Sequence, residues 1–440
     1  MEFANDQHAN ACLVRFIRDS PTGLVFLVRD HCRQSLARLS HFSAGKNIAL
    51  AYSLRYEAHR QRVTAHPISI VEVRSRAERD EFIKFQWQVY KKDPAWVPPL
   101  LIERKAFLDR EKHPFYKHGD AALFVAKRDN EIVGRIMASD DPNYNALHES
   151  NVGCFGLFES IDDVDIAKAL FDVAAEWLRR RGRSDIIGPI DYSTNYICGL
   201  LIDGFEHPPT LLTAHNPPYY ARLIEACGFQ KEKDWYAWWF SEYPEPAARL
   251  RKIAEARARK EKITIRSIDK KKIDEEGQKI RTVYNQAWEK NWGFVPFTEA
   301  EAEHMANELK PIIVPGATLI AEIGERPIGF VIGVPDVNVA LRKINGRLTW
   351  FGLPIGLIKL LYYLKKTKTG RLIALGVVQE YRRSGIAEML VLRLMDEAFR
   401  RGFTGELSMT LEDNVMVNRF IEAMGASKYK TYRIYRRPIV

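Results

Sequence analysis

The sequence predicts an α/β protein made of two similar halves, each a mixed, mostly antiparallel sheet flanked by helices. The first observation is size, because 440 residues of which 46% are hydrophobic exceed one ordinary hydrophobic core. The second is repetition. The order strand, helix, hairpin, strand, helix, strand, helix, strand occurs twice, from about residue 68 to 240 and from about 263 to 438. We therefore predict domains at residues 67–242 and 263–440.

The remaining segments have other compositions. Residues 1–66 mix Arg, His and short apolar patches without sustained periodicity, and we predict a tail or extension with no assigned function. Residues 243–262 are rich in Ala, Arg, Lys and Glu, which predicts a linker helix between the two domains. Residues 339–369 form an apolar insertion within the second domain.

An aromatic turn ends the first helix of each half. Tyr90–Pro98 (YKKDPAWVP) and Trp288–Pro296 (WEKNWGFVP) align without a gap. The elements that follow also correspond, which favours a true duplication. They are hairpins turning at Asp129-Asn130 and near Gly324–Pro327, strands at Val152–Phe158 and Leu372–Val378, and long helices at Ile166–Arg181 and Gly385–Arg401, ended by Gly182 and Gly402.

Bulk composition excludes several classes of protein. The longest apolar runs are shorter than the roughly 18 residues that a membrane-spanning helix needs. The five cysteines are spread singly, and no His or Cys pattern has metal-ligand spacing, so we expect neither a disulfide framework nor a metal. With no secretory signal, a cytoplasmic location follows. The net charge of +10 suits phosphate-bearing ligands or an anionic membrane, but the basic residues are too scattered to predict nucleic-acid binding.

The most informative segment runs from an apolar strand through a small-residue turn into a helix, at residues 371–401. Such a turn gathers backbone amides at a helix N-terminus, where they bind anions. A plain strand-to-helix connection with solvated arginines is the alternative. The residues that we predict to hold a diphosphate are Arg382, Arg383, Ser384, Gly385, Ile386 and Ala387.

Arg382, Gly385 and Ala387 fill the pattern Arg/Gln-x-x-Gly-x-Gly/Ala, so the segment resembles the acyl-CoA loop of the GNAT superfamily of N-acyltransferases. The resemblance implies acyl-CoA as co-substrate, no metal, and direct attack by an amine on the thioester. It also implies that a backbone amide at Val377 or Val378 polarises the thioester carbonyl, opposite residues 408–411. Asn414 and Asn418, which flank the next helix, are further expected contacts of the cofactor.

The acid and base are less well defined. Many members of this superfamily carry Tyr where this chain has Phe420, so we consider Tyr432, with Tyr429 beside it, as the acid. Asp336 and Glu412 are candidate bases because both follow predicted strands near the thioester. An ordinary loop acid is an equally good explanation of either carboxylate, and a core or surface aromatic of either tyrosine.

In the equivalent place the first half has no glycine and three aspartates within residues 158–165, and these carboxylates would repel a diphosphate. We interpret this half as a degenerate copy that forms a wall of the substrate site. Asn195 and Tyr220 of this half, with Trp292 and Asn338 of the second, are the predicted substrate contacts. Turn chemistry for Asn195 and a structural role for Tyr220 are the alternatives.

The insertion contains an apolar run edged with aromatics at residues 350–364, followed by lysines. This pattern fits a segment in a membrane interface with anionic head groups, although a helix packed against the first domain would look similar.

The tandem layout, Asn285–Pro296, Pro335–Asn338 and the insertion together resemble a bacterial subfamily that includes bacterial ceramide synthase-like acyltransferases, over about residues 68–440. The resemblance implies a long-chain acyl-CoA donor and a sphingoid-type amine, at the inner face of the cytoplasmic membrane. Two alternatives stay open: a soluble N-acetyltransferase acting on a small amine or peptide, and a non-catalytic basic binding protein.

Overall fold

The computed structural model describes residues 15–18, 24–27, 67–243 and 247–439. The chain divides into two compact units, Met1–Pro67 and Ile68–Val440. In the first unit, β1 (Arg15–Arg18) and β2 (Leu24–Leu27) pair antiparallel. The rest of the predicted tail, residues 1–66, lies outside the described residues. The second unit carries every element discussed below.

The N-terminal half of this unit matches the predicted order of elements. It contains β3 (Ser69–Glu72), α2 (Arg76–Lys84), α3 (Gln86–Val89), α4 (Leu101–Phe107), η2 (Pro114–Lys117), β4 (Asp120–Arg128), β5 (Glu131–Asp140), α5 (Pro142–His148), β6 (Val152–Ser160), α6 (Val164–Arg179), β7 (Asp185–Gly188), β8 (Leu200–Asp203), α7 (Tyr220–Ala226) and β9 (Gln230–Phe240).

Helix α8 (Ala247–Lys260) follows, where a linker helix was predicted. The C-terminal half then contains β10 (Thr264–Ser267), η3 (Lys270–Lys272), α9 (Ile273–Ala287), α10 (Glu299–Leu309), η4 (Pro315–Ala317), β11 (Thr318–Ile323), β12 (Arg326–Pro335), α11 (Asn338–Leu341), α12 (Ile355–Lys366), β13 (Thr369–Val377), η5 (Gln379–Tyr381), α13 (Ile386–Arg400), β14 (Thr404–Leu411), α14 (Val415–Ala423) and β15 (Ser427–Pro438).

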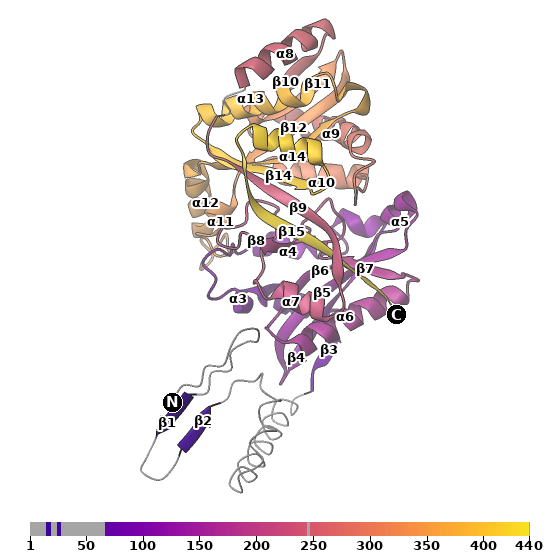
Figure 1. Ribbon diagram of the computed structural model, residues 1–440, viewed down its shortest axis with the longest axis vertical. Helices are drawn as coiled ribbons and strands as arrows, with labels where there is room; N and C mark the ends of the chain where they lie inside the picture. The colour runs from indigo at the N-terminus through magenta and orange to yellow at the C-terminus, as the bar shows by residue number, and fades with distance from the viewer. Residues whose placement is uncertain (1–14, 19–23, 28–66, 244–246, 440) are drawn as a thin grey trace, which may run out of the picture. The chain divides into compact units, whose positions relative to one another are not determined.

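The two halves exchange their last strands, which the sequence did not predict. One sheet of 13 strands has the order β10-β11-β12-β13-β14-β9-β15-β7-β6-β5-β4-β3, with β8 beside β15 (Figure 1). Strand β9, from the N-terminal half, pairs with β14, and β15, from the C-terminal half, pairs with β7. The long antiparallel pair β9–β15 joins the halves at the centre of the sheet. The mixed, mostly antiparallel sheet of the prediction is confirmed.

Local sequence explains the elements that surround the site. Asp129 and Asn130 both adopt positive φ, as a two-residue hairpin turn requires, and Gly324 turns the corresponding hairpin. Helices α6 and α13 each present an apolar stripe to the sheet and stop before Gly182 and Gly402, whose φ values of 78° and 72° favour glycine.

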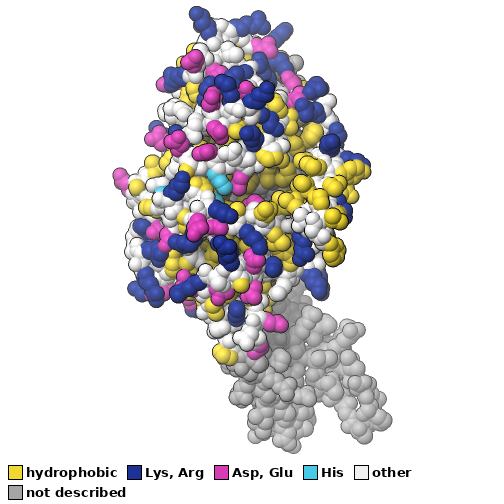
Figure 2. Space-filling model, turned by 180° about the vertical axis from the view of Figure 1, so that it is seen from behind, with side chains coloured by type: hydrophobic (Ala, Val, Ile, Leu, Met, Phe, Trp, Pro, Cys, Tyr) yellow, Lys and Arg dark blue, Asp and Glu magenta, His cyan; other side chains and the backbone are white. Residues whose placement is uncertain are grey.

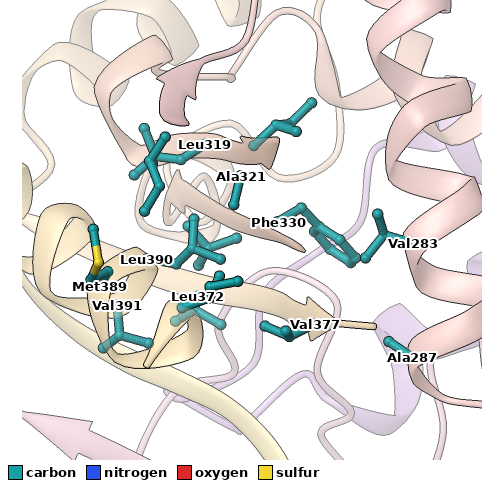
Figure 3. Packing of buried hydrophobic residues seen from close by; sticks show 14 of the residues in the cluster. Val283, Ala287, Leu319, Ala321, Phe330, Leu372, Val377, Met389, Leu390 and Val391 are labelled. Atoms are coloured by element: carbon teal, nitrogen blue, oxygen red, sulfur yellow. The ribbon is translucent and has the colours of Figure 1, made fainter. Parts of the chain in front are cut away.

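The C-terminal core lies on both faces of its sheet. In Figure 3, Leu390 and its neighbours from α13 approach β12 and β13 from one side, while Val283 of α9 faces Phe330. Within the described residues no helix has the length and apolar character to cross a bilayer.

Candidate acyl-CoA site

Strands β13 and β14 run parallel but separate before they end. Their pairing covers only Thr369–Leu372 against Thr404–Leu407. Beyond this point β13 keeps its pairing with β12 as far as Val377, and β14 keeps pairing with β9 as far as Leu411. The sheet therefore contains a gap whose edges are residues 373–377 and 408–411.

A cavity of about 370 Å³ opens at this gap. Its volume lies within the range of about 300–1,000 Å³ that small-molecule pockets usually have. Both edges of the gap line it, together with α9 and α10 on one side and residues of the N-terminal half on the other. The N-terminal half contributes Thr194, Asn195, Tyr196, Cys198, Leu212 and Trp235.

The turn between β13 and α13 leaves its helix N-terminus uncapped. Gly385 is the N-cap residue, with φ of 85°, and among the described residues no side chain caps the first turn of α13. The first amides of a helix have no intrahelical partner, and they point along the axis with the positive end of the helix dipole. This arrangement is suited to a diphosphate.

The side chains of the turn differ in what they can offer. Arg382 and Arg383 are exposed, and Arg382 donates to the carbonyl of Ala287 at the end of α9. Ser384 departs from its predicted role as a phosphate ligand. Its hydroxyl donates to the Tyr381 carbonyl at 2.6 Å and its amide donates to the same oxygen at 3.0 Å, so it shapes the turn. The Ile386 side chain is buried, and Ala387 packs on the core.

Of the two predicted thioester-polarising amides, only one points into the gap. The Val378 amide donates to the Ile328 carbonyl at 3.0 Å, so it is already paired and is not the free donor that we expected. Successive amides of a strand point to opposite sides. The Val377 amide, which lies opposite Gly329, therefore faces the side from which β14 has departed.

The N-terminal half has the same gap, but its own side chains fill it. Strands β6 and β7 pair only over Val152–Cys154. Beyond that point, Asp191 accepts the amide of Leu157 at 3.0 Å, and the Tyr220 hydroxyl accepts the amide of Ser160 at 2.9 Å.

Two glycines establish which amides correspond. Ser160 is the partner of Gly134, which packs on α6, just as Val377 is the partner of Gly329, which packs on α13. The Val377 amide thus has its counterpart in an amide that Tyr220 occupies. At the start of α6, the Asp163 side chain accepts from the amides of Asp165 and Ile166. Tyr220 is also absent from the cavity lining, so it is structural rather than the substrate contact predicted.

Asp336 and Asn338 anchor a loop of the N-terminal half instead of reaching the gap. The Asp336 carboxylate accepts the amide of Leu211 at 3.0 Å, and Asn338 donates to the Pro209 carbonyl at 2.9 Å. Leu212, which follows Leu211 in this loop, lines the cavity. Asp336 is buried, and burial raises its pKa to about 6. Neither predicted residue lines the cavity, so their effect on it is through the loop.

Glu412 and Tyr432 also lie outside the cavity lining. Glu412 accepts from the Lys231 ammonium at 2.6 Å and from the Asp234 amide at 3.0 Å, so it fastens β14 to β9. Tyr432 is fully buried, and burial raises the pKa of its hydroxyl further above the ordinary value. The described residues that line the cavity include no carboxylate and no imidazole.

Four predicted site residues remain to be placed, three asparagines and one tryptophan. Asn195, Trp292 and Asn414 all line the cavity. Asn195 is held by the Tyr284 hydroxyl at 2.6 Å and donates to the Val295 carbonyl at 3.2 Å. Asn418 does not line it. Its amide donates to the Leu411 carbonyl at 3.0 Å and its oxygen accepts from Thr410 at 2.5 Å, so it ties α14 to the end of β14.

Sequence reasoning missed the cavity wall formed by α9 and α10. Trp288, whose indole donates to the Leu375 carbonyl at 3.2 Å, stands at the end of this wall. The aromatic turn was a detectable signal for it. The apolar faces of the two helices were not, because a helix face that lines a cavity has the same periodicity as one that packs on a sheet. Among the described residues no group of His, Cys, Asp and Glu is arranged to hold a metal ion.

Known proteins are similar to this chain over most of its length. Residues 278–426 match the acetyltransferase (GNAT) family. The chain is 39% identical over 369 residues to Protein YghO of Escherichia coli (strain K12), covering 81% of this chain and 92% of that protein. It is 35% identical over 383 residues to the bacterial ceramide synthase of Caulobacter vibrioides (strain NA1000 / CB15N), covering 84% and 98%.

A solved structure supports the tandem fold. A tandem GNAT protein from the clavulanic acid biosynthesis pathway superposes with a TM-score of 0.51 at 12% identity, covering 85% of this chain and 99% of that chain.

Proposed function

Because the chain belongs to the GNAT family of acyl-CoA-dependent N-acyltransferases, we propose that it transfers a long-chain fatty acyl group to the amine of a sphingoid-type lipid. The observation that carries the proposal is the open gap in the C-terminal half, with an uncapped helix N-terminus at one end and a largely apolar cavity at the other. The 35% identity to a bacterial ceramide synthase supports the lipid acceptor.

In the proposed reaction, the first turn of α13 holds the diphosphate and the Val377 amide donates to the thioester oxygen. The neutral amine attacks the carbonyl carbon, so that a C–N bond forms and the C–S bond breaks. The amine gives up one proton, and the CoA thiolate becomes the thiol. We propose that Asn195 and Trp292, which line the cavity, orient the amine.

We also propose that α12 and the turn before it form a membrane-binding face. Its most exposed apolar side chains are Phe351, which is 98% exposed, Ile358 at 63%, Leu353 at 59% and Leu361 at 53%. Residue Gly356 alone in α12 is buried. Figure 2 shows such hydrophobic side chains gathered at one edge of the molecule, with Lys and Arg around them. An exposed apolar patch with a basic margin suits a lipid surface.

The charge of this segment supports an anionic surface. From Val337 to Gly370 the sequence contains no Asp or Glu, whereas it contains Arg342, Lys343, Arg347, Lys359, Lys365, Lys366 and Lys368. Such residues gain about 1 kcal/mol each near an anionic leaflet.

Vesicle flotation tests the membrane-binding face. We expect binding to vesicles that contain phosphatidylglycerol but not to pure phosphatidylcholine vesicles. The double variant F351S/I358S should lose most of this binding. Leu147→Ser, which removes an exposed apolar side chain from α5, is the matched control. Equal binding to both vesicles, or undiminished binding of the double variant, contradicts this part of the proposal.

Turnover of a sphingoid base with either palmitoyl-CoA or acetyl-CoA tests the reaction itself. We expect kcat/KM to be at least tenfold higher with palmitoyl-CoA, and mass spectrometry to detect the N-acyl product. Equal or better use of acetyl-CoA would replace the lipid reaction with N-acetylation of a small amine or peptide.

A further inference from the structure

The cavity continues from the gap along the whole of one helix. Ile273, Gly277, Ile280 and Tyr284 line it at intervals of four, three and four residues, which is one face of α9. The facing wall is one face of α10, formed by Ala302, Met305, Ala306 and Leu309. Phe330 and Ile332 of β12 form the floor.

This chamber is lined mainly by apolar side chains, although Arg281 and Thr318 also line it, and its far end lies among buried residues. Ile268, Ile273 and Ile313 line it there, and all three are buried. Its near end is the edge of β13 at residues 373–375, beside the indole of Trp288. Two of the polar lining residues, Thr194 and Asn195, come from the opposite, N-terminal wall.

We infer that this chamber between α9, α10 and the sheet receives the hydrocarbon chain of the acyl donor and limits its length. The inference rests on the proposed function. The thioester carbonyl must lie beside the Val377 amide at the edge of β13, and the chamber begins at that edge. The acyl chain is bonded directly to this carbonyl, whereas the amine must approach it from another side. The opposite, N-terminal wall is therefore the side left for the acceptor.

The length of α9 gives an estimate of the length of the chamber. Ile273 and Tyr284 are eleven residues apart, which in an α-helix is about 16 Å. An extended chain of single bonds advances about 1.2 Å per bond, since the three backbone bonds of a residue span at most about 3.6 Å. The chamber thus fits about 14 bonds, which corresponds to donors of about 14 to 16 carbons.

Small residues let α9 and α10 pack closely at half the depth of the chamber, which lies between this helix pair and the sheet. Gly277 of α9 faces Ala306 of α10, and a Cβ at position 277 would lie only 3.1 Å from the Ala306 Cβ. A larger side chain at position 277 would therefore press on α10. Ile280, one turn nearer to the gap and only half-buried, is a better site for a test because a new side chain there has room to enter the cavity.

Calorimetric affinities for CoA and for acyl-CoAs of 4, 8, 12, 14 and 18 carbons test the inference without an acceptor. For the wild type we expect affinity to rise with chain length up to about 14 carbons, at most about fourfold per methylene, and then to level off. Ile280→Trp should bind CoA and butanoyl-CoA within twofold of the wild type but bind tetradecanoyl-CoA at least 30-fold more weakly. Ile312→Trp, at a half-buried core position outside the cavity, should behave as the wild type.

Different failures have different meanings. If the wild type binds CoA but shows no dependence on chain length, or if Ile280→Trp keeps the full dependence, the chamber does not hold the acyl chain and the inference alone fails. If the variant changes the dependence of kcat/KM on acceptor chain length and leaves the donor dependence intact, the chamber belongs to the amine and the inference is again overturned. If the wild type does not bind CoA at all, the proposed function fails as well.

Discussion

The two halves of the sheet have the same gap, open in one and filled in the other. In the N-terminal half, the Tyr220 hydroxyl and the Asp191 carboxylate accept the amides of Ser160 and Leu157, and Asp163 caps α6. In the C-terminal half, none of the described side chains is seen to accept a hydrogen bond from the Val377 amide or from the start of α13, and a cavity of about 370 Å³ opens at the gap. A fold can therefore keep its geometry while it loses a ligand site, because a few polar side chains replace the ligand.

The difference between the open and the filled gap is tested most directly at Gly385. Gly385→Asp would place a carboxylate where α6 has one, and its charge would repel the diphosphate from the first turn of α13. Aspartate tolerates the positive φ of this position better than most residues. We expect CoA to bind at least 100-fold more weakly, a loss of about 3 kcal/mol measured by titration calorimetry.

Two control variants accompany this prediction. Gly385→Asn has the same shape without the charge and should lose no more than about tenfold, since 1.4 kcal/mol corresponds to that factor. Asp163→Asn in the N-terminal half should leave CoA affinity within twofold. Unchanged affinity in Gly385→Asp would remove α13 from the binding site.

Tyr220→Phe tests whether the filled gap is structural. The variant leaves the Ser160 amide buried without its acceptor and also removes a bond to Glu159, which the Tyr220 hydroxyl donates at 2.7 Å. We expect the free energy of unfolding in urea to fall by about 1–3 kcal/mol. CoA affinity and turnover should stay at the wild-type level. Loss of turnover in the folded variant would restore Tyr220 as a substrate contact. Tyr362→Phe, at an exposed hydroxyl, should change stability by less than about 0.5 kcal/mol.

Asp336→Asn is expected to have only a small effect on turnover. Because Asp336 anchors Leu211 and lies outside the cavity lining, kcat/KM at pH 7.5 should change by less than about threefold. A loss of 100-fold or more with unchanged CoA affinity would instead identify Asp336 as the general base.

The stability of the Asp336→Asn variant should also depend on pH differently from that of the wild type. Burial raises the folded-state pKa of Asp336 from 3.8 to about 6, so the folded chain holds this proton more tightly than the unfolded chain. This contribution to stability is fully present below pH 4 and is lost as the pH rises through 6. Urea unfolding at several pH values should show that Asp336→Asn lacks this fall between about pH 4 and 6. A fall of equal size in the variant would mean that another group causes it.

The sequence was a good guide wherever function depends on backbone geometry. Gly385 and the strand before it predicted a strand-to-helix turn, which the structure shows with an uncapped helix N-terminus, and the aspartates at 162–165 marked the half in which Asp163 caps the helix. Side-chain roles were harder. Asp336, Glu412 and Asn338 follow strands at loop positions typical of catalytic groups, yet each is committed to a contact with the other half. Such contacts join residues more than a hundred positions apart, which no local pattern reveals.

The exchange of β9 and β15 has a consequence for biosynthesis. The open side of β7 finds its partner only when Ser427–Pro438 has been made, more than two hundred residues after Gly188. At about 5–20 residues per second, a ribosome needs on the order of ten seconds or more for that stretch. During this interval the nascent N-terminal half carries an unpaired strand edge, the kind of surface on which chains aggregate. A premature stop codon anywhere before β15 would therefore damage the half that had already been translated.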